Sequence, residues 1–492
     1  MEAALFDYFG VLGNIPYLVA ILGVINLLIA LAIIFLERKD TSATLAWIMI
    51  LFLLPVIGII LYLFLSQNIS RQKIFRLTKY EEDSIRDALA NQIREIDDRE
   101  FVFSTEEAKR WKDMIKLNQT YANAFLTQDN RLFIMTDGIH MFDQLIEDIK
   151  NAKRTINIMS FIIKNDFVGK KLIRELTMKA MQGVEVRLLI DAMGGRQISP
   201  LTLADFKDAG GKYAFFFPPK FKYLNMKLNY RNHRKIAVID GETGYIGGFN
   251  IGKEYLGRKK KFGYWRDTHL KVLGSGVQDI NARFLLDWRF ASKEKVVLSE
   301  AYYSEVISLG VTGLQIVSSG PDSKKEEVKR CYMKMITSAE KNVYIQTPYF
   351  VPDASILESL KMAALAGVDV RIMIPCMPDH MFVYWATYSY VGELLNSGAR
   401  VFIYNNGFMH AKTMVVDGEV ASIGSANFDM RSFKLNFEAN AIIYDAAEAY
   451  KLEAIFENDM VYCRELTQAL YRKRSVFIRF KESIARLLSD IL

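Results

Sequence analysis

Two segments of the 492-residue chain share one pattern, HRKIAVIDGETGYIGGFN from His233 to Asn250 and HAKTMVVDGEVASIGSAN from His410 to Asn427. In both segments a lysine follows the histidine by two residues, an aspartate follows it by seven and an asparagine by seventeen. Each contains a β-branched apolar run and then an Asp-Gly pair, which is typical of a β-hairpin turn. The two segments therefore predict two equivalent hairpins.

The spacing also predicts which side chains share a face. An offset of two places His233 with Lys235 on one face of the first strand, and His410 with Lys412 on one face of the second. The offset of seven is odd, so Asp240 and Asp417 are expected on the opposite face, supporting the turn rather than touching a substrate.

The register of each hairpin follows from the assumed position of its turn. If the first turn spans Asp240 to Thr243, His233 lies opposite Asn250 and Lys235 lies opposite Gly248. The second hairpin then places His410 opposite Asn427, and Lys412 opposite Ser425.

The hairpins end two copies of a longer repeat. AKRTINIM followed by MQGVEVRLLID occupies residues 152–191, and AEKNVYIQ followed by LAGVDVRIMIP occupies residues 339–375. Buried strands that alternate with helices indicate an α/β sheet. We therefore expect two similar α/β domains about a pseudo-twofold axis, with one site at their interface.

Paired histidines, lysines and asparagines suit chemistry at a phosphodiester. The lysines and asparagines would hold the non-bridging oxygens in the transition state. One imidazole could attack phosphorus while the other protonates the leaving alcohol. This chemistry needs no metal ion and no cofactor.

Two acidic residues are candidates for orienting the imidazoles. Glu438 follows Asn427 by eleven residues, and Asp267 follows Asn250 by seventeen. A carboxylate that accepts the Nδ1 proton of histidine fixes its tautomer. The alternative for each is an ordinary salt bridge with Arg266 or Arg431.

The first part of the chain is strongly apolar. Residues 15–36 and 45–65 carry no charged side chain, and each run could span roughly 30 Å as a helix. We expect two transmembrane helices joined as a hairpin. Four basic residues follow the second run and two lie between the runs, which favours a cytoplasmic catalytic region.

Net charge does not decide the partner of this chain, whereas the cysteines exclude a disulfide-rich protein and a cysteine metal site. The formal net charge of +7 suits an anionic membrane, a phosphate substrate or nucleic acid equally well. The three scattered cysteines form neither a disulfide framework nor a metal-ligand spacing, as is usual in a reducing cytosol.

The motifs resemble the paired signature of the phospholipase D superfamily. Further stretches, among them YWRDTHL, QTPYFVPD and SANFDMRSFKLNFEANA, resemble bacterial cardiolipin synthases over almost the whole chain. The resemblance implies transfer of a phosphatidyl group from one phosphatidylglycerol to another, with release of glycerol, at the bacterial inner membrane. It involves no nucleic acid, and it leaves the oligomeric state open, with a homodimer as one alternative.

Motif positions carry the family's catalytic set onto this chain. The resemblance implies six catalytic residues: His233, Lys235, Asp240, His410, Lys412 and Asp417. The substrate-binding candidates are Asn250, Asn427, Ser425 and Gly248, with Glu438 and Asp267 orienting the histidines. Analogy favours His233 as the nucleophile, whereas the residues themselves leave the choice open.

The expected organisation is a membrane anchor over residues 1–67, a helical linker over 68–127, and phospholipase-D-like domains over 128–300 and 301–492. The second domain ends in an amphipathic helix, whose apolar face could cover the domain or lie on a membrane. Three rival functions use the same residues: a phospholipase D with water as acceptor, a nuclease, and a membrane scaffold with an inactive site. The apolar runs argue against the nuclease, and the two intact motifs argue against the scaffold.

Overall fold

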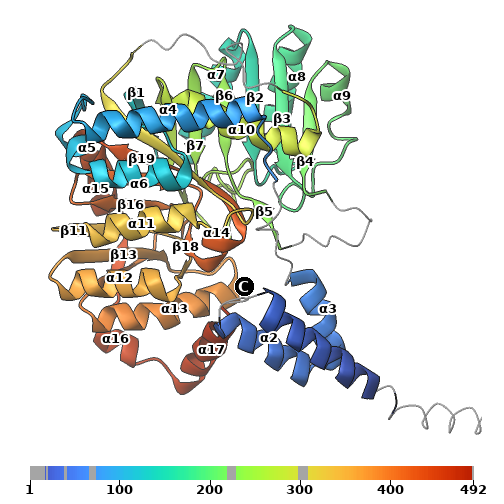
Figure 1. The fold of residues 1–492 in the computed structure, drawn as a ribbon, viewed down its shortest axis with the longest axis vertical. Helices are drawn as coiled ribbons and strands as arrows, with labels where there is room; N and C mark the ends of the chain where they lie inside the picture. The colour runs from blue at the N-terminus through green and yellow to red at the C-terminus, as the bar shows by residue number, and fades with distance from the viewer. Residues whose placement is uncertain are drawn as a thin grey trace, which may run out of the picture. The chain divides into compact units, whose positions relative to one another are not determined.

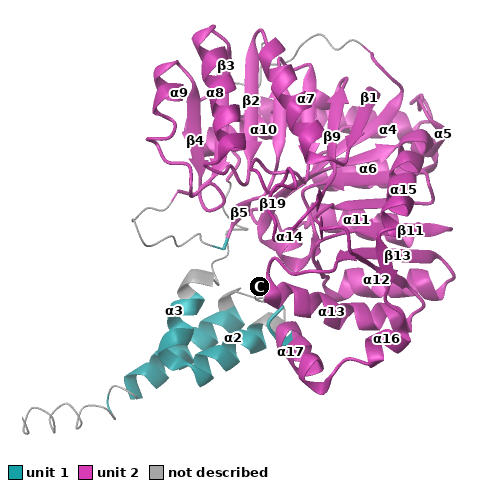
Figure 2. Cartoon of the chain, turned by 180° about the vertical axis from the view of Figure 1, so that it is seen from behind, with its two compact units in different colours: residues 1–68, 219–229, 487–492 teal, residues 69–218, 230–486 magenta. Residues whose placement is uncertain are grey.

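A computed structural model describes residues 17, 20–37, 41–65, 74–218, 229–296 and 308–489. Contacts divide the chain into two compact units (Figure 2). The larger comprises residues 69–218 and 230–486, and the smaller comprises residues 1–68, 219–229 and 487–492.

In the smaller unit, the second apolar run is not one continuous helix. It forms α2 (Thr41–Leu53) and α3 (Pro55–Leu65), separated at Leu54. Pro55 has no N–H to continue the helical ladder, which explains the interruption. In the first run, residues 20–32 are helical and lead into the π-helix η1 (Ile33–Glu37). Within the described ranges, no single helix has both the length and the apolar character needed to cross a bilayer.

The larger unit contains both copies of the repeat in one mixed sheet (Figure 1). The strand order is β20-β14-β13-β11-β16-β17-β19-β10-β1-β9-β7-β6-β2-β3-β4. The two halves meet where β1 and β10 pair antiparallel. The expected halves are therefore parts of one compact unit and share one sheet.

The strands of each half follow the same sequence of pairings. The first half contains β1 (Thr127–Met135), β2 (Thr155–Ser160), β3 (Glu185–Asp191), β4 (Lys212–Phe216), β6 (Ile236–Ile239), β7 (Thr243–Gly247) and β9 (His269–Leu273). The second contains β10 (Thr312–Ser319), β11 (Asn342–Gln346), β13 (Asp369–Pro375), β14 (Arg400–Tyr404), β16 (Thr413–Val416), β17 (Val420–Gly424), β19 (Asn436–Tyr444) and β20 (Cys463–Glu465). Five two-residue strands lie among them: β5 (Arg231–Asn232), β8 (Trp265–Arg266), β12 (Phe350–Val351), β15 (Phe408–Met409) and β18 (Phe428–Asp429).

Helices cover both faces of this sheet. One face is covered by α7 (Gly138–Asn151), α8 (Phe167–Met181), α9 (Ala204–Asp208), α11 (Glu327–Thr337), α12 (Ala354–Leu365) and α13 (Met381–Asn396). The opposite face is covered by α10 (Gly276–Ser292) and α15 (Ala446–Met460). The remaining helices of this unit are α4 (Lys79–Asp97), α5 (Glu106–Arg110), α6 (Lys112–Ala122), α14 (Met430–Lys434), α16 (Gln468–Arg472) and α17 (Val476–Leu487). Burial of the sheet on both faces explains why its central strands are apolar at almost every position.

The two motif hairpins have the same turn, and its position corrects the expected register. Asp240 and Gly241 both have positive φ, and the N–H of Glu242 donates to the carbonyl of Ile239. The turn therefore begins at Ile239, one residue earlier than expected. Ile239 pairs with Thr243 across the three-residue loop 240–242, which extrapolates to Lys235 opposite Gly247 rather than Gly248. In the second hairpin Val416 pairs with Val420, and the register shifts in the same way.

Candidate active site

Each motif histidine is placed by a short strand that pairs with the other half of the molecule. β5 leads into His233 and pairs parallel with β19, and the N–H of His233 donates to the carbonyl of Phe437 at 2.9 Å. β15 leads into His410 and pairs parallel with β8, and the N–H of His410 donates to the carbonyl of Arg266 at 2.7 Å. Both histidines therefore lie at the junction of the two halves.

This backbone pairing brings each imidazole to a carboxylate of the opposite half. Nδ1 of His233 lies 3.0 Å from both carboxylate oxygens of Glu438, and Nδ1 of His410 lies 2.5 Å from Oδ2 of Asp267. Both carboxylates are fully buried. An Nδ1–H that donates to a carboxylate leaves Nε2 with its lone pair. Arg266, the alternative partner of Asp267, instead places its Nε 2.8 Å from Asp459.

The two motif lysines lie beside the histidines, as the offset of two predicts. Nζ of Lys235 donates to the carbonyl of His233 at 2.6 Å. Nζ of Lys412 donates to the carbonyl of His410 and lies 2.9 Å from its Nδ1. Both lysines are almost completely buried, so two ammonium groups are held close to the two imidazoles.

Burial dominates the electrostatics of these four basic groups. It lowers the pKa of His233 to about 4, and Glu438 offsets only part of that shift. Burial likewise lowers the pKa of Lys235 to about 7 and that of Lys412 to about 8. Burial and the charge of Lys412 also lower the pKa of His410. Near pH 7 the imidazoles are therefore neutral, the form that can act as a nucleophile or base.

The two carboxylates respond in the opposite sense. Burial alone would raise their pKa values. The pKa of Asp267 is nevertheless below its ordinary value because of Lys412 and His410. The pKa of Glu438 is lowered by His233 and Lys235 in the same way. Both carboxylates remain ionised beside the imidazoles.

The motif aspartates lie away from this cluster. The carboxylate of Asp240 accepts hydrogen bonds from the backbone N–H groups of Lys153, Arg154 and Thr155 at 2.7–2.9 Å. Asp417 accepts the equivalent three from residues 340–342 at 2.7–2.9 Å. These contacts tie each hairpin turn to the start of a neighbouring strand, which agrees with the supporting position that the odd offset predicts. The catalytic role that the resemblance implies for both aspartates stays a prediction.

Ser425 and Gly248 occupy equivalent positions but do different things. The Ser425 hydroxyl donates to Oε2 of Glu438 at 2.5 Å, which directs it to the carboxylate instead of a substrate. A Cβ on Gly248 would lie 1.9 Å from Oδ1 of Asp267, so glycine leaves the space that this carboxylate fills. Both residues therefore lie against the carboxylates that contact the imidazoles, and their expected role in substrate binding stays a prediction.

The two motif asparagines are buried close to the junction of the halves. Oδ1 of Asn250 accepts from the N–H of Ile162 at 3.1 Å. Nδ2 of Asn427 donates to Asp429 at 3.2 Å, while its Oδ1 is buried without a hydrogen-bond partner among the described residues. Asn427 thus retains one polar atom for a further contact.

Several neighbours of the site carried no recognisable signal in the sequence. The rings of Phe161 and Trp265 lie 4.9 Å from the imidazoles of His233 and His410, respectively. Arg234, between His233 and Lys235, points the other way, as its odd offset could have indicated. Its guanidinium binds Asp287 at 2.7–2.8 Å and the carbonyl of Glu438 at 3.0 Å, which links the two halves.

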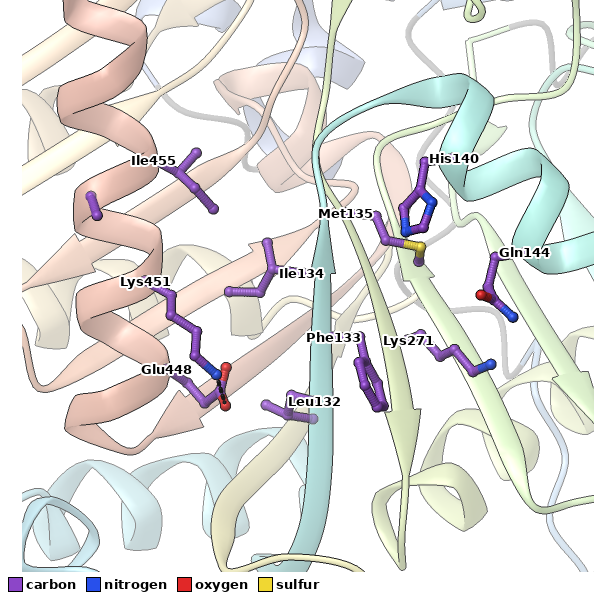
Figure 3. A pocket seen from close by; sticks show the side chains of 11 residues that line it. Leu132, Phe133, Ile134, Met135, His140, Gln144, Lys271, Glu448, Lys451 and Ile455 are labelled. Atoms are coloured by element: carbon purple, nitrogen blue, oxygen red, sulfur yellow. Dashed lines mark hydrogen bonds and ion pairs between the residues drawn. The ribbon is translucent and has the colours of Figure 1, made fainter.

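A pocket of about 680 Å³ lies apart from these residues, between β1, α7 and α15 (Figure 3). His140, Lys271 and Lys451 contribute its polar side chains together with Gln144 and Glu448. None of the paired histidines, lysines or carboxylates lines it, so this cavity does not mark the candidate active site.

Comparisons with known proteins agree with the paired arrangement. The family model "Cardiolipin synthase, PLD-like domain" matches residues 145–263 and 332–460. The model "Phospholipase_D-nuclease N-terminal" matches residues 24–67.

Relatives match over the full length. The chain is 50% identical to a cardiolipin synthase of Listeria monocytogenes, over 98% of this chain and 100% of the relative. It is 47% identical to a cardiolipin synthase of Oceanobacillus iheyensis, with the same two coverages. Among solved structures, phosphatidylserine synthase of Haemophilus influenzae aligns with a TM-score of 0.60 and 16% identity, over 77% of this chain and 100% of that one. That likeness concerns the fold alone.

Proposed function

The chain belongs to the cardiolipin synthase family of phospholipase-D-like proteins, and we propose that it joins two phosphatidylglycerol molecules through a phosphohistidine formed at the cross-paired imidazoles. The observation that carries this mechanism is that each buried histidine contacts a carboxylate of the opposite half. Two imidazoles with fixed tautomers, beside two buried ammonium groups, supply both a nucleophile and a proton donor for a phosphodiester.

In the first half-reaction, Nε2 of His233 attacks the phosphorus of one phosphatidylglycerol. An N–P bond forms, and the bond from phosphorus to the glycerol headgroup breaks. His410, which is neutral in the free site, takes up a proton once the anionic phosphate lies beside it, because a nearby negative charge favours the imidazolium form. Asp267 stabilises this form, and His410 then donates the proton to the leaving glycerol oxygen. Lys235 and Lys412 hold the non-bridging oxygens, on which negative charge develops.

The second half-reaction reverses these roles. The terminal hydroxyl of a second phosphatidylglycerol attacks the phosphohistidine, and His410 accepts the hydroxyl proton. A new P–O bond forms as the N–P bond breaks, which yields cardiolipin and restores neutral His233. The free Oδ1 of Asn427 is a candidate acceptor for a hydroxyl of the incoming headgroup.

We also propose that the apolar runs at residues 15–36 and 45–65 anchor the enzyme in the bacterial inner membrane, with the catalytic unit on the cytoplasmic side. Side chains along both runs are exposed, for example Leu28 and Phe52. Exposed apolar side chains in this density favour a lipid environment. Such an anchor keeps the site beside its two lipid substrates.

Purified enzyme with phosphatidylglycerol in mixed micelles tests the reaction, with lipid products followed by mass spectrometry. Cardiolipin and glycerol are expected from the unsubstituted chain and not from His233→Ala or His410→Ala. Asp240→Asn is a matched control at the structural end of the same motif and should retain the reaction once folded. Phosphatidic acid as the main product would identify water as the acceptor and refute the synthase mechanism.

The intermediate has its own test. Quenching with sodium dodecyl sulfate at neutral pH during turnover with phosphorus-labelled phosphatidylglycerol should leave label on the wild-type protein, in an acid-labile and base-stable form. Label retained by His233→Ala but not by His410→Ala would reverse the assigned roles.

A further inference from the structure

Helix α17 exposes its apolar side chains. Val476, Phe477 and Phe480 are 74%, 65% and 60% exposed, and Ile484 is 39% exposed. A helix on the surface of a globular protein ordinarily turns such a stripe toward the core. Among the residues that the structure describes, the stripe of α17 therefore covers no core of the larger unit.

The face that α17 turns inward is small or polar. Ala485 and Glu482 are buried, and Glu482 accepts a hydrogen bond from Arg474. Arg486 pairs with Glu393 of α13, and Nζ of Lys481 lies 5.0 Å above the ring of Trp385 on the same helix. These contacts fix the rotation of α17 about its axis, so the outward direction of the stripe is built into the fold.

Positive charge surrounds the stripe. Arg472, Lys473 and Arg479 are exposed. Between Gln468 and Leu487 the single acidic side chain is Glu482, which is buried and paired. Apolar side chains next to exposed basic groups match an anionic lipid surface, in which acyl chains lie beneath negative headgroups. A second copy of this surface would oppose like charges, so it is a poorer partner.

We propose that α17 is a docking helix that inserts its apolar stripe into the surface of an anionic bilayer. The geometry connects this helix to the catalytic residues. α17 is held on α13, which begins two residues after Asp379. Asp379 accepts a hydrogen bond from Tyr349, and its charge acts on His410 and Lys412. Docking therefore fixes the catalytic unit against the lipid from which both substrates come, independently of the N-terminal runs.

A lipid-quenching experiment on the full chain tests the contact directly. Phe480→Cys is labelled with an environment-sensitive fluorophore in a Cys376→Ser, Cys463→Ser background and placed in nanodiscs. We expect quenching by shallow spin-labelled lipids when the disc contains phosphatidylglycerol, with a loss of at least half of the quenching in purely zwitterionic discs. A label at Met362, which is equally exposed on α12, is the control and should stay unquenched. Absence of quenching at position 480, or equal quenching at both positions, would overturn the proposal.

Activity provides a second, separate measurement. The triple variant Phe477→Ser, Phe480→Ser, Ile484→Ser should lose about tenfold of its activity on vesicles and keep its activity in micelles, because each lost apolar contact weakens partition into lipid. Met362→Ser, Leu365→Ser removes exposed apolar residues from α12 and should leave both activities unchanged. If the triple variant instead lowers the particle mass in light scattering and position 480 is not quenched, the stripe covers another copy of the chain and the lipid proposal is wrong. The quenching measurement does not need turnover, so failure of docking and failure of the proposed reaction are distinguishable.

Discussion

Glu438→Gln tests the assignment of the orienting carboxylate with little change in volume. In the native site Oε1 accepts from Nδ2 of Asn436 at 3.1 Å, and Oε2 accepts from the Ser425 hydroxyl at 2.5 Å. In the variant, the NH₂ group of the new glutamine cannot lie against Nδ2 of Asn436, because both are donors. It can lie against Ser425, whose hydroxyl can rotate to accept a hydrogen bond from it. The amide oxygen then still receives the Nδ1 proton of His233. The substitution therefore removes the charge and keeps the hydrogen bond.

The size of the effect follows from that exchange. A hydrogen bond to a charged group contributes about 1.5–3 kcal/mol. His233 becomes cationic as it attacks phosphorus, so the charge of Glu438 stabilises the transition state more than the ground state. Loss of this stabilisation corresponds to a decrease in kcat of about 10–150-fold. If the substitution also moved the proton of His233 from Nδ1 to Nε2, the decrease in kcat would be larger, up to about 10⁴-fold.

Initial rates of cardiolipin formation in mixed micelles measure this decrease, and thermal unfolding shows whether the variant is folded. Asp267→Asn is the matched variant in the other half and should also lower kcat, through His410. If His233 is the nucleophile, Glu438→Gln should slow the labelling of the protein, whereas Asp267→Asn should slow both half-reactions. A folded Glu438→Gln enzyme with kcat within about threefold of wild type would refute the role of the cross-half carboxylate.

Three further outcomes follow from the structure. Gly248→Ala should abolish most activity, because the new Cβ would lie 1.9 Å from Oδ1 of Asp267 and displace this carboxylate. Initial rates measure the loss, and circular dichroism shows whether the variant is folded. Near-normal activity would contradict the prediction. Arg234→Met leaves the buried charge of Asp287 without its main partner and should lower the free energy of unfolding by about 3–5 kcal/mol. Denaturant titration measures this loss. A loss below about 1 kcal/mol would show that the ion pair does not hold the halves together. The pKa of Lys235 is lowered to about 7, so its charge is present below that pH and lost above it, and kcat/KM should fall on the alkaline side with a midpoint near 7. Lys235→Arg should move this alkaline limb upward by more than one pH unit, and an unmoved limb would assign it to another group.

Local spacing predicted the parts of the site that depend on one strand at a time. The offset of two places His233 and Lys235 together, and the odd offset separates Asp240 from them. The exact register failed by one residue because Asp240 itself adopts positive φ at the centre of the turn. The preference of Asp-Gly for turns predicts that a turn lies at this dipeptide, but it does not predict which positions of the turn the two residues occupy.

Tertiary contacts were the part that spacing could not supply. The sequence offered Glu438 and Asp267 as partners for the imidazoles without deciding which carboxylate serves which histidine. That choice depends on the pairing of β5 with β19 and of β15 with β8, between segments far apart in the chain. The role of Ser425 depends on the same packing, since its hydroxyl reaches Glu438 only once β19 lies alongside. In the N-terminal runs, by contrast, Pro55 was visible in the sequence and signals the interruption between α2 and α3.

The exchange of carboxylates between the halves also has a consequence during synthesis of the chain. His233 and Glu438 are separated by 205 residues, so a nascent chain that has folded only its first half holds a histidine without the group that orients it. Such a chain, or one cut by proteolysis before residue 438, lacks half of the paired site. The paired site is complete only when β19, which carries Glu438 and pairs with β5, has joined the sheet.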